Sequence, residues 1–245
     1  MRNIKLTLAY EGTAYLGFQR QKQGPTIQGT LEESLVHLTG ERPRVIGAGR
    51  TDAGVHALGQ VVNFHTSSRI ETGRFVPALN SLLPRDIAVL AAEEVPLAFH
   101  ARRDAKRKTY TYRLWRPSVR PVFERDRSYH FPRPLDLAAM EAAPRLLVGR
   151  HDFAVFGSSG STEVKTTVRT VFAAGWQEEG PLLTFTITAD GFLYRMVRNI
   201  VGTLLEIGLG KHPPEWVEEL LALGHRPAAG PAVPARGLFL VRVEY

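Results

Sequence analysis

The sequence contains no cysteine among its 245 residues. This absence excludes disulfide bonds, thiolate nucleophiles and metal or iron–sulfur sites with cysteine ligands. Long apolar runs are also missing, since no stretch approaches the roughly 20 residues that a membrane-spanning helix needs. We therefore expect a soluble, unexported protein with no membrane partner. The lack of cysteine fits a reducing cytoplasm.

Clustered metal ligands and nucleotide-binding glycine motifs are lacking as well. There is no His-Glu-x-x-His motif; His56 stands alone, and we interpret His151-Asp152 as a structural corner. The glycines at 47 and 49 are followed by the next one only at 54, and no Gly-Lys-Ser/Thr follows, which excludes a dinucleotide fingerprint and a P-loop. We expect no catalytic metal.

Residues 47–57 read Gly-Ala-Gly-Arg-Thr-Asp-Ala-Gly-Val-His-Ala and combine backbone freedom with chemically active side chains. The glycines allow positive φ and close backbone approach, while Arg50 and Asp52 put a cation and a carboxylate two residues apart. Asp before Ala-Gly can instead do no more than cap a turn. A strand expected over 60–65 would hold the loop on rigid structure, and Asp52 is the leading candidate nucleophile or base.

The positive charge is concentrated in one segment. The net charge is +7, and residues 100–133 hold eleven Lys and Arg against three Asp and Glu, or 11 − 3 = +8. The remaining residues hold 20 basic and 21 acidic groups. This distribution is typical of a phosphate-binding surface, although a solvated basic stretch would look the same.

Hydrophobic periodicity predicts two α+β halves, residues 1–105 and 106–245. We expect one continuous, mainly antiparallel sheet with helices on one face and a central cleft between the halves, where a site would lie. The expected strands cover residues 4–10, 60–65, 87–95, 108–115, 168–177, 182–189 and 239–243. The expected helices cover residues 26–39, 73–83, 137–148, 192–209 and 214–223.

The expected helix over 192–209 has a clear apolar stripe, formed by Phe192, Met196, Ile200, Thr203 and Ile207. We expect the opposite side to carry Arg195, Arg198, Gly202 and Glu206.

Five stretches, spread in order over nearly the whole chain, resemble the tRNA pseudouridine synthase A family. They are residues 10–21, 47–57, 99–113, 192–202 and 234–238. The resemblance implies isomerisation of uridine to pseudouridine at positions 38, 39 and 40 of the tRNA anticodon stem-loop. It also implies a homodimer without a cofactor, and extrusion of the target base from its stack. One departure is the segment 157–165, which lacks the cysteine-containing sequence found in many members. The RNA contacts of this segment therefore stay undetermined.

The resemblance also implies roles for single residues. The aspartate of the family's Gly-Arg-Thr-Asp-Ala-Gly-Val run is the nucleophile, which corresponds to Asp52, and the arginine of its Val-Arg-Asn run, here Arg198, pairs with that aspartate. Arg50 would support the extruded nucleotide, unless it faces Asp52 itself. Tyr110 reads as a core aromatic from periodicity alone, but its match implies a ring that stacks on the base.

The remaining candidates divide into two groups. The substrate-binding group, with Arg50 and Tyr110, includes Thr51, Gln19 and Arg20. The RNA-binding group consists of Phe99, His100, Arg102, Arg103, Lys106 and Arg107.

Several alternatives stay open at this point. Asp52 could attack the ribose C1′ or the pyrimidine C6, or assist a glycal route. A non-catalytic RNA-binding protein could use the same sheet, aromatics and basic segment. An RNA hydrolase would need a metal cluster or a histidine pair, which the sequence does not offer.

Overall fold

The computed structural model describes residues 1–158, 166–223 and 229–245. Most of the segment 157–165 therefore lies outside the described residues. The chain divides into two compact units. One consists of Met1–Lys106 together with Phe239–Tyr245, and the other of Arg107–Leu238.

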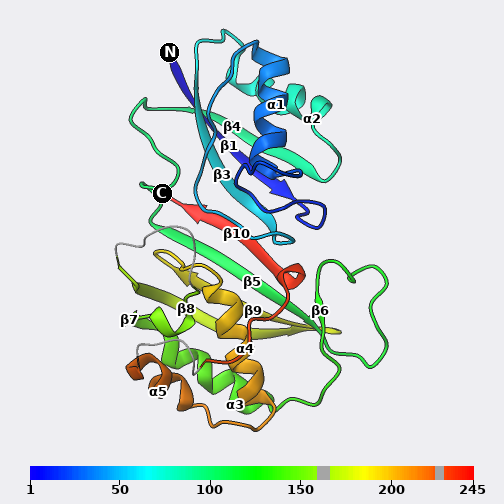
Figure 1. Cartoon of the computed structure of the whole chain (residues 1–245), viewed down its shortest axis with the longest axis vertical. Coiled ribbons are helices and arrows are strands. Elements are labelled where there is room, and N and C mark those ends of the chain that lie inside the picture. The colour runs from blue at the N-terminus through cyan, green and yellow to red at the C-terminus, as the bar shows by residue number, and fades with distance from the viewer. Residues whose placement is uncertain (159–165, 224–228) are drawn as a thin grey trace. The chain divides into compact units, whose positions relative to one another are not determined.

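The first unit is built on a sheet with the strand order β4-β1-β3-β10 (Figure 1). Its strands are β1 (Arg2–Tyr10), β3 (His56–Thr66), β4 (Ile87–Val95) and β10 (Leu238–Glu244), and the short β2 (Ile46–Gly47) pairs with β3. Strand β1 runs antiparallel to both of its neighbours, whereas β10 is parallel to β3. The C-terminal strand thus belongs to the unit that begins the chain.

Strand β1 and helix α1 (Ile27–Thr39) form as the sequence pattern predicts. The alternate residues Ile4, Leu6 and Leu8 are fully buried, as expected of a strand with one face in the core. At the start of α1 the Thr26 side chain accepts a hydrogen bond from the Gly29 amide, and the helix ends where the backbone turns left-handed. Helix α2 (Phe75–Leu82) follows later in the chain, and Figure 1 shows it beside α1.

The second unit contains an antiparallel sheet with the strand order β5-β9-β8-β7. The strands are β5 (Arg107–Trp115), β7 (Gly149–Asp152), β8 (Val168–Glu179) and β9 (Leu182–Ala189), and the short β6 (Tyr129–His130) pairs with β5 in parallel. The strands expected over 168–177 and 182–189 are β8 and β9, and they pair as an antiparallel hairpin.

Helices α3 (Leu137–Ala142), α4 (Met196–Gly208) and α5 (Trp216–Leu223) complete this unit (Figure 1). The helix expected over 137–148, with a shift or kink at Pro144, is an α-helix only as far as Ala142, and a 3₁₀ helix covers Ala143–Leu147. Pro144 has no amide hydrogen to donate to the preceding turn, so the α-helical hydrogen bonds cannot continue through it.

The predicted start of α4 was wrong. The helix begins at Met196, not at Phe192, because Arg195 adopts a left-handed conformation with φ of 59°. In addition, Gly202 is buried, and a Cβ atom on it would lie 1.8 Å from the carbonyl oxygen of Pro231. The face opposite the apolar stripe is therefore covered by the chain near Pro231, and the glycine permits this close approach.

Both units are mixed α/β structures with mainly antiparallel strands, which confirms the predicted fold class. Within the three described ranges, no helix combines the length and apolar character needed to cross a membrane.

Candidate active site

The central loop of the first unit joins β2 to β3 and carries Arg50, Thr51 and Asp52. Arg50 is exposed, Asp52 is half-buried, and Thr51 between them points into the unit and is buried. The amide of Val55 donates to the carbonyl oxygen of Asp52 over 3.1 Å, which closes a turn directly after the aspartate. The loop thus presents a cation and a carboxylate on either side of one anchored residue.

A buried polar network fixes the anchored residue from inside the unit. The Tyr10 hydroxyl lies 2.8 Å from the Thr51 hydroxyl, and the Gln60 amide donates to the carbonyl oxygen of Gly49 over 2.9 Å. Burial raises the pKa of Tyr10 to about 12, although its hydrogen bonds to Thr51 and Gln60 act in the opposite direction. Tyr10 therefore stays a neutral hydrogen-bonding group at any physiological pH.

The loop formed by residues 12–21 supports the same segment from another side. The Phe18 amide donates to the carbonyl oxygen of Thr51 over 3.0 Å. Gly17, with φ of 95°, lies so close that a Cβ atom on it would be 2.7 Å from that oxygen and 3.1 Å from the carbonyl carbon of Asp52. No side chain fits between these two backbones, so glycine is required for the contact.

His56 has a structural environment rather than a ligand-like one. It is buried, its Nδ1 accepts a hydrogen bond from the Gly12 amide over 3.1 Å, and its ring stacks on Phe239 with centroids 4.6 Å apart. Because Nδ1 accepts this bond, its lone pair is not available to a metal. Within the described part of the chain, no group of three or more His, Asp or Glu residues could hold a metal ion.

Arg50 and Arg102 lie close enough to influence each other. Burial lowers the pKa of Arg50 most, and the positive charge of Arg102 lowers it further. Arg102 and Arg103 are exposed on a turn that His100 caps, since its Nδ1 accepts from their amides at 3.2 and 3.3 Å. The repulsion between the cations would be relieved by an anion bound beside them.

The other RNA-binding candidates of the first unit lie near this turn. The ring of Phe99 packs against Tyr245, with centroids 4.9 Å apart, and its carbonyl oxygen accepts from the side chain of Asn3 over 3.0 Å. Lys106 is exposed, and its amide donates to the carbonyl oxygen of Glu244 over 2.8 Å. Phe99 and His100 thus shape the turn, and the exposed charges belong to the arginines and Lys106.

Gln19 and Arg20 are exposed at the end of the supporting loop. The amide of Arg20 donates to the side chain of Gln28 over 2.9 Å, and its guanidinium lies 3.3 Å from the carboxylate of Glu32. The structure therefore connects Arg20 to helix α1.

The second unit holds the remaining predicted residues. Tyr110, on β5, is 7% exposed, and its ring meets the edge of Phe192 at 4.9 Å between centroids. The guanidinium of Arg107, on the same strand, lies 4.5 Å from the ring centre of Phe172. Tyr110 is thus held in position by a neighbouring aromatic ring, and Arg107 lies at an exposed aromatic surface.

Arg198 lies in the first turn of α4 and is half-buried. Its Nε donates to the carbonyl oxygen of Val233 over 2.7 Å, which ties the side chain to the segment before the last strand. In the described residues, Arg195 just ahead of the helix is the one non-glycine residue with positive φ. The predicted pairing of Arg198 with Asp52 joins residues of different units and stays a prediction.

A family model described as tRNA pseudouridine synthase matches residues 7–104 and 143–245. The chain belongs to this family. The tRNA pseudouridine synthase A of Moorella thermoacetica is 50% identical over 244 residues, which cover 99% of each chain. Those of Acetivibrio thermocellus and Caldicellulosiruptor bescii are 46% and 47% identical over 245 residues, which cover 100% of each chain.

The family consists of isomerases that act on tRNA uridine, which confirms the predicted enzyme class. The matched residues include Arg50, Asp52 and Arg198, whereas Tyr110 and Arg107 lie between the two matched stretches. Pattern reading missed Tyr10, Gly17 and Gln60 as supports of the loop. Tyr10 looked like a core residue of an alternating strand, and the only signal for Gln60 was a polar amide inside a buried strand.

Proposed function

We propose that this chain converts uridine to pseudouridine at positions 38, 39 and 40 of the tRNA anticodon stem-loop, with Asp52 as the nucleophile. The observation that supports this most is the way Thr51 is anchored. Its hydroxyl meets Tyr10 and its carbonyl oxygen accepts from Phe18, so that Asp52 stands half-buried on a backbone held from two sides. A nucleophile gains from such preorganisation because less conformational freedom has to be lost on the way to the transition state.

The reaction rearranges bonds within one nucleotide. The N1–C1′ bond breaks, the uracil turns, C5 bonds to C1′, and the proton on C5 leaves while N1 gains one. Atoms and electrons balance without an oxidant, so the chemistry calls for no electron carrier. Asp52 must be ionised to attack C1′ or C6, or to accept a proton in a glycal route.

Three further side chains have proposed roles. Arg50 supports the extruded nucleotide, with Arg102 nearby to share its phosphate. Tyr110 stacks on the uracil, which must leave the base stack to be reached, and Arg198 keeps Asp52 ionised. We also propose that the protein acts in the cytoplasm as a homodimer.

The decisive experiment is the Asp52→Asn variant, assayed for tRNA binding and for release of the C5 proton on one preparation. The amide keeps the shape of the side chain and removes its charge, so we expect binding to persist and turnover to vanish. Asp126→Asn is the matched control, since its carboxylate forms an exposed pair with Arg125. Turnover by Asp52→Asn would remove Asp52 from the mechanism. A wild-type protein that binds tRNA but never isomerises it would instead support a non-catalytic RNA-binding protein.

A further inference from the structure

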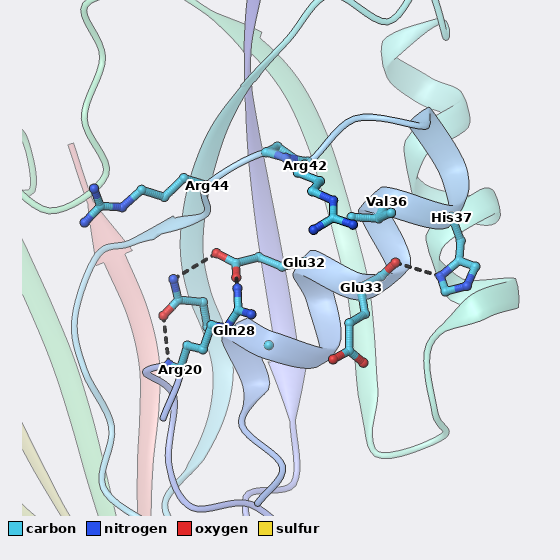
Figure 2. Close-up of a pocket in the computed structure, with 10 residues that line it drawn as sticks. Arg20, Gln28, Glu32, Glu33, Val36, His37, Arg42 and Arg44 are labelled. Carbon is cyan, nitrogen blue, oxygen red and sulfur yellow. Dashed lines mark hydrogen bonds and ion pairs between the residues drawn. The ribbon is translucent and has the colours of Figure 1, made fainter. Parts of the chain in front are cut away.

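The first unit has a hollow of about 490 Å³ beside helix α1, away from the residues assigned above except for Arg20. Figure 2 shows that its wall comes from α1, from Arg20 and from the segment that leads into β2. Three arginines border it, which are Arg20, Arg42 and Arg44. A hollow with several cations at its edge is a candidate site for an anionic ligand.

The carboxylate of Glu32 lies in the interior of the hollow, and both of its oxygens have partners within the unit. One oxygen accepts from the side chain of Gln28 over 3.0 Å and from the amide of Val45 over 3.1 Å, and the other lies 3.3 Å from Arg20. Only 11% of the Glu32 side chain is exposed. This carboxylate therefore holds α1, the supporting loop and the segment before β2 together. Its hydrogen bonds and ion pair go to these partners and not to Arg42 or Arg44.

Arg42 and Arg44 are exposed, and the structure gives neither side chain a hydrogen-bond or ion-pair partner among the described residues. Pro43 between them is buried, which fixes the three-residue run against the unit. In Figure 2 the Arg42 side chain points toward α1, whereas the Arg44 side chain points away from it. Glu33, on the exposed side of α1, is the remaining acidic residue at the hollow. Arg42 and Arg44 carry two positive charges against this one negative charge, which leaves an excess of one positive charge.

The geometry distinguishes between two kinds of anion. A single small anion is held best by donors that converge on it, but these two guanidinium groups diverge. Guanidinium groups that extend in different directions from one anchored run suit successive phosphates of a polyanion. The family acts on tRNA, so RNA is the polyanion that this surface meets.

We propose that Arg42 and Arg44 form a second contact for the tRNA backbone, separate from the residues that handle the target nucleotide. This inference rests on tRNA being the substrate in the proposed function. Arg44 precedes Arg50 by six residues, so their Cα atoms are at most about 20 Å apart. One RNA molecule can therefore contact both the hollow and the loop of residues 47–57, which we call the signature loop.

The test is the double variant Arg42→Ala/Arg44→Ala, with tRNA affinity measured across a series of salt concentrations. Loss of two phosphate contacts should flatten the slope of log K against log salt by about one to two units. The rate of isomerisation of tRNA already bound should stay unchanged. The control is Arg74→Ala/Arg85→Ala, which removes the same charge from two exposed arginines of the same unit.

Three results would overturn the proposal. The slope of the double variant could equal that of the wild type, or the control could flatten it equally, which would mean that only net charge matters. Inorganic phosphate could bind the wild-type hollow at millimolar concentration without RNA, which would assign the site to a small anion. If wild type isomerises tRNA normally in any of these cases, the proposed function stands. Wild type could also bind tRNA without isomerising it while the double variant still has a flatter slope of log K against log salt. In that case only the proposed function fails, and the second tRNA contact stands.

Discussion

The phenol of Tyr10 and the hydroxyl of Thr51, which are 41 residues apart in the chain, lie 2.8 Å apart in a buried site beneath the signature loop. Tyr10 ends a strand at the centre of the sheet of the first unit, and Thr51 precedes the proposed nucleophile. The hydrogen bond therefore connects an interior strand of the sheet to the residue that precedes Asp52.

The first prediction is that Tyr10→Phe lowers kcat about tenfold while tRNA affinity stays within about twofold. The variant keeps the ring but leaves the buried Thr51 hydroxyl without its partner, which should also reduce stability by about 1–2 kcal/mol. Tyr15→Phe is the control, since its hydroxyl donates to Asp86 over 2.7 Å and does not contact the signature loop. Equal effects of the two variants on kcat would show that Tyr10 does not position the loop.

The second prediction concerns alkaline stability. The pKa of Tyr10 is raised from 10.0 to about 12 in the folded protein, so the folded state retains a proton that the unfolded state loses. The contribution is complete below pH 10 and is lost as the pH rises toward 12, with a total of about 3 kcal/mol. Urea unfolding at pH 9 and pH 11 should show a smaller decrease for Tyr10→Phe than for wild type. An identical decrease in both proteins would contradict the assignment.

The third prediction is that Gly17→Ala lowers turnover far more than it lowers stability. Its Cβ atom would press on the backbone of Thr51 and Asp52, and the positive φ adds a strain of about 1–3 kcal/mol. Gly40→Ala is a matched control, because Gly40 also has positive φ, at 71°, but a Cβ there would have no atom within 4 Å. We expect Gly17→Ala to melt at a lower temperature than Gly40→Ala, because only at Gly17 would the Cβ meet backbone atoms, and we expect a loss of activity of about tenfold or more in Gly17→Ala alone. Full activity of Gly17→Ala would mean that the loop can shift without consequence.

The fourth prediction separates the ring of Tyr110 from its hydroxyl. A stacked aromatic contributes about 1–3 kcal/mol per base, and Tyr110→Phe keeps that contribution. If the hydroxyl accepts the C5 proton, the Phe variant should break the glycosidic bond and then stall, and Tyr110→Ala should also bind the target base less well. Analysis of the bound RNA by mass spectrometry after a single turnover checks both outcomes. Normal product from Tyr110→Phe would limit the residue to stacking.

Local patterns predicted the parts of the fold that depend on neighbouring residues. The alternation in β1, the Thr26 cap of α1 and the hairpin of β8 and β9 are each encoded within a few residues. The signature loop could be found for the same reason, because its glycines and charged residues are adjacent in the sequence.

The missed features depend on residues that are far apart in the chain. Gly202 is a close-approach glycine because Pro231 lies against it, and Gly17 is one because Thr51 does. Nothing near Arg195 indicates its left-handed backbone, which sets the start of α4. Such contacts are properties of the folded unit, and periodicity along a single helix or strand does not contain them.

The position of strand β10 has a consequence for how the protein is made. Phe239 pairs with His56 and stacks on its ring, and Tyr245 donates to the carbonyl oxygen of Ala101 over 2.8 Å. Translation proceeds from the N-terminus, so the ribosome completes Arg107–Leu238 before it supplies this strand. A nascent chain stopped before Phe239 would lack the strand beside β3, which leads out of the signature loop. Completion of the first unit is thus delayed until the last residues are synthesised, and prematurely terminated chains would lack a complete first unit.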